Sequence, residues 1–224
     1  MAESIRVVVA PGAVTALRYP ATEPAAPLTL VLAHGAGAPQ TSAFMVDFAQ
    51  ALAHRGFPTV TFNFPYMEEG RRLPDRSSTL EACFRAVIAA VRERSDAATG
   101  WLVIGGKSLG GRMASHVAAA RLDDLAGLVL LGYPLHPPGQ PLKLRAEHLA
   151  RIREPMLFVQ GARDAFGTPE ELAPILTPLG PTVRVHVVAD GDHSFKVPKR
   201  GPVPQPQVFA RVQDEVAGWL RGLG

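Results

Sequence analysis

The chain has 224 residues, 47% of them hydrophobic, and a net charge of +3. This length and composition exclude a disordered chain and predict one globular domain, residues 1–224, whose core is large enough to fold without metals or disulfides. Because the small charge excess is not gathered into a long basic segment, we expect no nucleic-acid partner.

Short apolar segments alternate with longer amphipathic segments along the chain. The first two, 5–10 and 14–19, flank a Pro-Gly turn dipeptide and predict an antiparallel hairpin. Six further strands are predicted at 28–33, 59–63, 101–105, 127–131, 156–160 and 183–189. Helices are predicted at about 42–54, 78–95, 109–121, 169–176 and 207–220. The first of them is expected to carry Phe44, Phe48, Ala51 and Leu52 on one apolar side.

This alternation of strands and helices indicates the fold class. Right-handed crossovers place successive strands parallel to one another, with helices on both faces of the sheet. We therefore expect an α/β protein with an eight-stranded, mostly parallel sheet and the N-terminal hairpin at one edge. The segment between 131 and 155 is short and rich in proline, so we expect no large lid.

A G-x-S-x-G pattern follows the strand predicted at 101–105, where residues 106–110 read GKSLG. In this pattern a strand turns abruptly into a helix, and the glycines avoid collisions that would prevent the serine hydroxyl from being exposed. The alternative is a phosphate-binding turn, which requires a G-x-x-x-x-G-K-[ST] spacing that this segment lacks. We predict that Ser108 is a nucleophile.

A serine hydroxyl needs a general base, and the base needs a carboxylate to orient it. His193 follows the last predicted strand, and Asp164 follows the strand before it. They give the chain order Ser, Asp, His that is typical of a nucleophile at a strand-to-helix turn. Asp190 and Asp192 are rivals for the acid, but their closeness to His193 in sequence is typical of turn formers.

The segment after the first central strand, residues 34–38, reads HGAGA. Small residues let the backbone approach the serine and offer N–H groups to a developing oxyanion. We expect the oxyanion hole to be formed by the backbone N–H groups of Ala36 and Leu109, with Gly37 as the alternative to Ala36. The side chain of His34 is expected to brace this loop.

Aromatic residues near the ends of strands are candidates for substrate contact. We expect Tyr66, Tyr133, His136 and Phe195, together with Gly37, to line the pocket, and core packing is the alternative for each side chain. Because no group of His, Cys, Asp or Glu has the spacing of metal ligands, we expect neither a metal nor a cofactor.

Cysteine content and the terminal sequence bear on location. Cys83 is the single cysteine, so an intramolecular disulfide is excluded and a reducing compartment is compatible. Its apolar helical surroundings are typical of a buried thiol. The N-terminus lacks a secretory signal pattern, and no segment approaches the roughly 18 apolar residues of a membrane span. We expect a soluble, cytoplasmic protein without membrane contact.

Five segments together resemble a known family. They are HGAGA at 34–38, GGKSLGGR at 105–112, GYPLHPPGQP at 132–141, FVQGARDAFG at 158–167 and DGDHSF at 190–195. They are similar to the small dienelactone-hydrolase-like α/β hydrolases. Within these they resemble most the subgroup that includes the vertebrate testis-expressed protein 30 and the hydrolase-like domain of a chromatin-complex subunit. The resemblance implies the α/β-hydrolase fold and an esterase-like mechanism with Ser108, Asp164 and His193 at the triad positions, but no particular substrate.

The predicted activity is therefore hydrolysis of a small-molecule ester, with a short acyl group, through a covalent acyl-enzyme. One alternative is a catalytically weak or inactive interaction scaffold that keeps the hydrolase architecture. Another is a peptidase or an acyltransferase that uses the same three side chains. The sequence predicts no oligomeric state.

Overall fold

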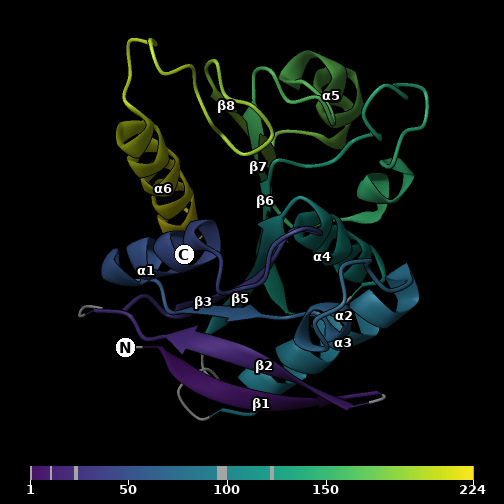
Figure 1. Cartoon of the computed structure of the whole chain (residues 1–224), viewed down its shortest axis with the longest axis vertical. Coiled ribbons are helices and arrows are strands. Elements are labelled where there is room, and N and C mark those ends of the chain that lie inside the picture. The colour runs from purple at the N-terminus through teal and green to yellow at the C-terminus, as the bar shows by residue number, and fades with distance from the viewer. Residues whose placement is uncertain (1, 11, 23–24, 95–99, 122–123, 224) are drawn as a thin grey trace.

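Figure 1 shows the chain as a computed structural model, in which residues 2–10, 12–22, 25–94, 100–121 and 124–223 are described. The strands are β1 (Glu3–Val9), β2 (Gly12–Tyr19), β3 (Leu28–Ala33), β4 (Thr59–Phe62), β5 (Trp101–Lys107), β6 (Leu125–Leu131), β7 (Met156–Gly161) and β8 (Val183–Val188). The α-helices are α1 (Ala43–His54), α2 (Pro65–Glu68), α3 (Ser77–Arg92), α4 (Leu109–Ala119), α5 (Pro169–Leu176) and α6 (Gln205–Arg221). The described residues also include two short 3₁₀ helices, Glu147–Arg151 and Thr177–Leu179.

The strands of the described residues form one eight-stranded sheet in the order β1-β2-β4-β3-β5-β6-β7-β8. Strand β2 pairs antiparallel with both β1 and β4, and the other neighbouring strands are parallel. The prediction of a mostly parallel, eight-stranded sheet with an N-terminal antiparallel hairpin at one edge is confirmed. All the parallel strands direct their carboxyl ends to the same side of the molecule, where ligands bind in open sheets of this type.

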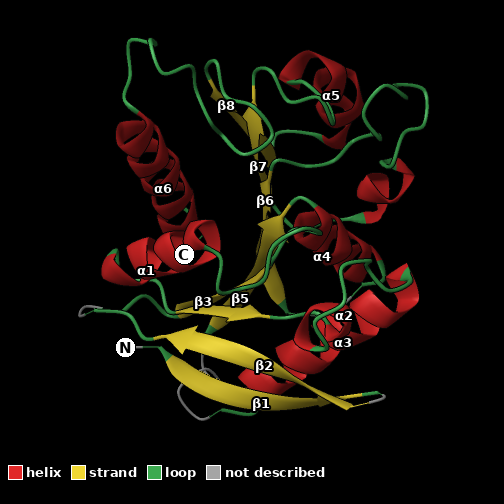
Figure 2. Cartoon of the chain, in the orientation of Figure 1, coloured by secondary structure: helices red, strands yellow, loops and turns green. Residues whose placement is uncertain are grey.

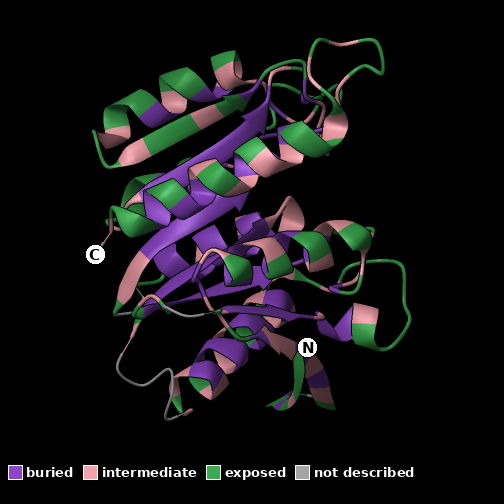
Figure 3. Ribbon diagram, turned by 90° about the vertical axis from the view of Figure 1, so that its left-hand side faces the viewer, coloured by how far each residue is buried: buried purple, intermediate pink, exposed green. Residues whose placement is uncertain are grey.

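Helices cover both faces of the sheet, as Figure 2 shows, with α1 and α6 on one face and α3 and α4 on the other. Successive residues of β3 therefore enter two different cores. Leu30 and Leu32 pack with α1 and α6, whereas Val31 and Ala33 pack with α3 and α4. A strand covered on both faces has no solvent side, which is why β3 is buried along its length and is apolar except for Thr29. The central strands form the buried layer in Figure 3.

The amphipathic pattern of α3 explains how it packs. Its buried residues are Leu80, Cys83, Phe84, Val87, Ile88 and Val91. They recur three or four positions apart, so they form one apolar stripe that faces the sheet. On α1, by contrast, the buried residues Met45, Phe48, Ala49, Leu52 and Ala53 form a stripe that differs from the one predicted. Phe44 and Ala51, which we expected on that stripe, are only partly buried.

Most element boundaries agree with the predicted ones within two or three residues. Strand β5 continues to Lys107, two residues further than predicted, because its pairing with β6 extends to the end of both strands. The short helix α2 was not predicted. Pro11 of the predicted turn and Ser95, the predicted end of the helix at 78–95, lie outside the described residues.

The connection between β6 and β7 leaves the carboxyl ends of the strands uncovered. Within the described part of the chain this connection contains the 3₁₀ helix Glu147–Arg151 and no helical cap, so the prediction of no large lid is confirmed. Among the described helices, none is both long and apolar enough to cross a membrane.

Candidate active site

Ser108 lies at the abrupt turn between β5 and α4. Its backbone has φ 51° and ψ −113°, a conformation that a residue with a side chain rarely adopts and that costs on the order of 1–3 kcal/mol. The flanking glycines are required by packing, because a Cβ at Gly106 or Gly110 would collide with the backbone carbonyl of Ala33 on the neighbouring strand β3. The G-x-S-x-G pattern thus allows β5 and α4 to pack against β3 while Ser108 stands at the turn.

The structure brings Ser108, His193 and Asp164 into one hydrogen-bonded chain. The Nε2 atom of His193 lies 2.9 Å from Ser108 Oγ, and its Nδ1 atom lies 2.8 Å from Asp164 Oδ2. An ionised carboxylate only accepts hydrogen bonds, so Nδ1 carries the proton and Nε2 is free to accept the hydroxyl proton of Ser108. This is the arrangement of a nucleophile, a general base and the carboxylate that orients the base.

The two rival aspartates have other partners. Asp192 Oδ1 accepts hydrogen bonds from the backbone N–H groups of Ser194 and Lys196, so this side chain closes the turn after β8. Asp190 has φ 54°, a left-handed conformation that aspartate tolerates in turns. Both therefore act as turn formers, and the geometry selects Asp164 as the partner of the imidazole.

Gln160 supports Asp164 and was missed by the sequence reasoning. Its side chain is buried at the end of β7, where Nε2 donates to Asp164 Oδ2 at 2.9 Å and to the carbonyl of Gly167 at 2.6 Å. Its Oε1 accepts from the backbone N–H of Tyr133 at 2.8 Å, which ties the loop after β6 to the same point. The available signal was a polar residue at the end of the otherwise apolar segment MLFVQ.

The loop after β3 is braced from one side. His34 is buried and donates from Nδ1 to the carbonyl of Gly35 at 2.7 Å, while its Nε2 accepts from the backbone N–H of Phe64 at 3.0 Å. Burial lowers the pKa of His34, which agrees with this neutral, donor-and-acceptor form. The expectation that His34 braces the loop agrees with these contacts.

The same bracing orients the amides of the loop. The hydroxyl of Tyr66 donates to the carbonyl of Ala36 at 3.0 Å, close to the bond that His34 makes with Gly35. In a trans peptide the N–H points opposite to the C=O, so the N–H groups of Ala36 and Gly37 point away from His34 and Tyr66. Leu109 opens helix α4, where the first N–H groups have no partner within the helix.

A cavity of about 570 Å³ contains Ser108 and His193 together with this loop. Its wall is lined by Gly35, Ala36, Gly37, Ala38, Ser42, Ala43, Phe44, Met45, Asp47, Phe48, Lys107, Ser108, Phe166, His193, Ser194, Lys196, Phe209 and Gln213. The aromatic part of the wall comes from α1, α6 and the loop after β7. The ring of Phe166 packs on the His193 imidazole, with 4.2 Å between ring centroids.

Of the residues expected to contact substrate, Gly37 lines this cavity and the other four do not. Tyr66 and Tyr133 are buried, and their hydroxyls donate to the backbone carbonyls of Ala36 and Arg145. Phe195 is buried beneath Lys107, whose ammonium lies 5.4 Å from its ring centroid. The ring of His136 lies against Glu171, with 3.3 Å between Nε2 and Oε1. These four side chains are therefore explained by packing, which corrects the expected substrate contacts.

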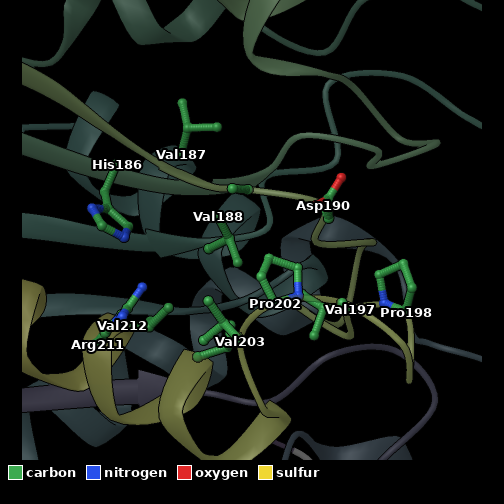
Figure 4. Close-up of a pocket in the computed structure, with 13 residues that line it drawn as sticks. His186, Val187, Val188, Asp190, Val197, Pro198, Pro202, Val203, Arg211 and Val212 are labelled. Carbon is green, nitrogen blue, oxygen red and sulfur yellow. The ribbon is translucent and has the colours of Figure 1, made fainter.

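A second, smaller hollow of about 190 Å³ lies between β8, the loop around 197–203 and α6 (Figure 4). Val188, Val203 and Val212 gather at its centre, with Pro202 beside them. This hollow contains neither Ser108 nor His193, and its lining is mainly aliphatic, so it is not part of the hydrogen-bonded site.

A thiol nucleophile and a metal centre are the other kinds of site that could carry hydrolytic chemistry. Cys83 is buried on α3, and burial raises the pKa of its thiol to about 12, so it is not a thiolate nucleophile. Among the described residues, no group of three or more His, Cys, Asp or Glu side chains is arranged to hold a metal ion.

Comparison with known proteins places this geometry in a family. Residues 26–221 match the family described as an alpha/beta hydrolase domain. An α/β serine hydrolase homologue from Coxiella burnetii is 18% identical, with 97% of each chain covered and a TM-score of 0.78. An α/β serine hydrolase without a lid from Xanthomonas campestris is 20% identical over 97% of this chain and 94% of its own, with a TM-score of 0.76.

A dienelactone hydrolase from Anabaena variabilis is also similar, with 18% identity, coverage of 99% of this chain and 97% of its own, and a TM-score of 0.78. At these identities the solved structures show the fold and not a shared substrate. The prediction of an α/β-hydrolase fold is confirmed.

Proposed function

The chain belongs to the alpha/beta hydrolase domain family, and from this premise we propose that it is a serine esterase that acts through a covalent acyl-enzyme. The observation that carries the proposal is the chain of contacts from Ser108 Oγ to His193 Nε2 at 2.9 Å and from His193 Nδ1 to Asp164 Oδ2 at 2.8 Å. Ser108 stands in the strained turn of a nucleophile and opens into a cavity.

The proposed reaction has two steps. In the first, His193 takes the proton of Ser108 as Oγ attacks the ester carbonyl carbon, and then gives that proton to the departing alcohol. In the second, His193 takes a proton from water as the water oxygen attacks the acyl carbon, and then gives that proton to Ser108 Oγ as the acid departs. Asp164 stays ionised throughout and stabilises the imidazolium.

The oxyanion of each tetrahedral intermediate needs N–H donors near Ser108. We assign this role to the backbone N–H groups of Leu109 and of Ala36, with Gly37 as the alternative to Ala36. Support comes from the bracing of the carbonyls of Gly35 and Ala36, which fixes the peptide planes before the reaction begins. Donors fixed in advance stabilise the developing charge without reorganising.

We also propose that the preferred substrates carry short or compact acyl groups. The apolar wall around Ser108 includes Phe44, Phe48 and Phe209, which can bury a small hydrocarbon or aromatic group. Within the described residues no cap closes over this wall, so chain atoms beyond it would remain in water and add little binding energy. A series of p-nitrophenyl esters tests this, and kcat/KM that rises steadily to long chains would contradict it.

The finer family assignment is part of the proposal. The segments GGKSLGGR at 105–112 and DGDHSF at 190–195 favour the subgroup of the testis-expressed protein 30 and the hydrolase-like domain of a chromatin-complex subunit. Work in the reducing cytoplasm agrees with the buried, unpaired thiol of Cys83 and stays a prediction.

The decisive test compares two serines of the same cavity wall. Wild-type protein should react with a fluorophosphonate probe at one site and hydrolyse p-nitrophenyl acetate. Ser108→Ala should lose both properties, whereas Ser194→Ala should still be labelled, because the Ser194 hydroxyl has no part in the contact chain. Labelling of Ser108→Ala at the wild-type stoichiometry would overturn the nucleophile assignment.

The same assay separates the alternatives. A scaffold without activity would give neither labelling nor turnover in the wild-type protein. A peptidase would cleave amides faster than matched esters, and an acyltransferase would form a new ester or amide when an alcohol or amine acceptor is added.

A further inference from the structure

Lys107 occupies an unusual place beside the proposed nucleophile. It is the last residue of β5, yet its side chain reaches the loop after β8, where Nζ donates to the backbone carbonyl of His193 at 2.5 Å. The same ammonium lies 5.4 Å from the ring centroid of Phe195. One charged group thus contacts the main chain of the proposed base and the aromatic residue two positions later.

This reach depends on a glycine at the end of β6. Strands β6 and β7 lie between β5 and β8 in the sheet, so the side chain must pass over the end of β6. Gly132 occupies that point with φ 61°, and a Cβ there would lie 2.6 Å from Lys107 Nζ and 3.0 Å from the His193 carbonyl oxygen. The absence of a side chain at Gly132 makes room for the contact between Lys107 and His193.

The ammonium is held there against the cost of burial. Desolvation lowers the pKa of Lys107 to about 8, although Asp164 and Asp192, which follow β7 and β8, act in the opposite direction. A methionine would fill the same volume without removing a charge from water. Compared with methionine, a lysine side chain adds a charged hydrogen-bond donor. Here that donor binds the backbone carbonyl of His193.

We propose that Lys107 is a positioning residue whose ammonium holds the main chain of His193, so that the imidazole remains within hydrogen-bonding distance of Ser108. The strand that ends in the nucleophile then also carries the group that holds the base. The strand β8 pairs with β7 alone in the described sheet, so the loop after it has less support from the sheet than the loops after the central strands. The hydrogen bond from Lys107 Nζ to the His193 carbonyl joins this loop directly to the end of β5. This inference rests on the proposed esterase function.

The test is a comparison of two lysines. Lys107→Met removes the charged donor and keeps a side chain of similar length, and Lys199→Met removes an exposed lysine from a loop outside the cavity. We expect Lys107→Met to lower kcat for p-nitrophenyl acetate by about tenfold to a hundredfold, because a misplacement near 1 Å costs on that order. The KM for this neutral ester should stay within about twofold, and Lys199→Met should match wild type.

Two outcomes would overturn the proposal. One is a wild-type kcat in Lys107→Met. The other is a raised KM with an unchanged kcat, which would mean that the lysine contacts substrate instead of positioning His193. Lys107→Gln keeps a shorter, neutral hydrogen-bond donor, so its kcat should lie between those of wild type and Lys107→Met. A kcat at or below that of Lys107→Met would also contradict the proposed positioning role.

If neither variant folds, the wild-type pH profile decides. The lowered pKa means that the ammonium loses its proton near pH 8, so kcat should decline above that pH, and a profile that stays flat to pH 9.5 would overturn the proposal. Failure of the underlying function is seen separately, because then either the wild-type protein would show no labelling and no turnover, or Ser108→Ala would retain both, whatever happens at Lys107.

Discussion

Among the described residues, two serine–histidine pairs lie at hydrogen-bonding distance, and the chemistry of the two differs. In the cavity, Ser108 Oγ lies 2.9 Å from His193 Nε2. Between α4 and the 3₁₀ helix Glu147–Arg151, Ser115 Oγ lies 2.8 Å from His148 Nε2, and both side chains are buried. The distances are almost equal, so distance alone does not distinguish a nucleophile from a structural hydroxyl.

The direction of the serine–histidine hydrogen bond distinguishes the two pairs. Ser115 donates its hydroxyl proton to the backbone carbonyl of Arg112 at 2.7 Å, as serines within helices often do, so its oxygen accepts from His148. At the other pair, Asp164 accepts a hydrogen bond from the Nδ1–H of His193, so Nε2 is left to accept a hydrogen bond from Ser108. A serine becomes a nucleophile when its proton has a base to go to, and this requires the carboxylate on the far side of the imidazole.

The surroundings differ as well. Ser108 stands in a strained turn, beside a cavity and the first N–H groups of α4, which have no partner within the helix. Ser115 lies within the regular helix α4 and is fully buried. Burial also lowers the pKa of His148 to about 3, with help from the nearby His116, Arg151 and Arg112, so this imidazole is a poor base at neutral pH.

The largest loss of activity should come from removing the Asp164 carboxylate, which is present at the Ser108–His193 pair and absent from the Ser115–His148 pair. Asp164→Asn keeps the shape, but its amide can donate to Nδ1 and favour the wrong imidazole tautomer. We expect kcat to fall by about 10⁴-fold, measured with p-nitrophenyl acetate. Asp192→Asn, which changes a turn-closing carboxylate on the His193 loop, is the matched control and should lose far less. Equal losses in the two variants would mean that Asp164 has no special role.

A smaller effect is expected at Gln160, which holds Asp164 in place. Gln160→Leu preserves volume but removes the donor to Asp164 Oδ2 and the acceptor for the N–H of Tyr133. We expect kcat to fall by about tenfold to a hundredfold, since the carboxylate loses its fixed position. The free energy of unfolding should fall by about 1–3 kcal/mol, because buried groups lose partners. Urea unfolding with activity assays checks both, and a wild-type kcat would refute the positioning role.

At the second pair the balance should reverse, with stability affected and activity spared. Ser115→Ala leaves the buried His148 Nε2–H without its acceptor, so we expect the free energy of unfolding to fall by about 1–3 kcal/mol. The kcat of the folded protein should remain within about twofold of wild type. A large loss of kcat at unchanged stability would contradict the distinction between the two pairs.

The sequence predicts the attacking group well because its determinants are local. The G-x-S-x-G spacing needs only the strand-to-helix turn around Ser108, and chain order narrows the base and the acid to loops after later strands. Continuous apolar segments such as β3 likewise predict central strands. Each of these signals is contained in a few neighbouring residues.

The groups that support the site were missed because their partners come from distant parts of the chain. Lys107 bonds to a carbonyl that follows β8, and Gln160 joins the loops after β6 and β7. Tyr66 was expected to face substrate and instead braces the carbonyl of Ala36. The alternation of side chains along a strand ends with the strand. It therefore does not predict the direction in which the side chain of a following loop residue points.

The last expected effect is confined to acid pH, and it sharpens the description of His148. Its pKa is lowered from 6.5 to about 3. Between these two pH values the imidazole is therefore protonated in the unfolded chain and neutral in the native state. At pH above 6.5 both states are neutral at this residue and no penalty exists. As the pH falls from 6.5 toward 3, the unfolded state gains the proton first, and wild-type stability is lost.

His148→Gln tests this, because an amide can still donate to Ser115 but does not titrate. The free energy of unfolding, measured by urea titration between pH 7 and pH 4, should fall less steeply in the variant, by up to about 1.4 kcal/mol per pH unit. His34, whose pKa is also lowered, contributes equally to both proteins and cancels in the difference. His116 lies 4.0 Å from His148 between ring centroids and helps to lower the pKa of His148, so its share belongs to the effect that the variant removes. Parallel curves would mean that His148 binds protons alike in both states, and that its pairing with Ser115 is not the neutral contact described above.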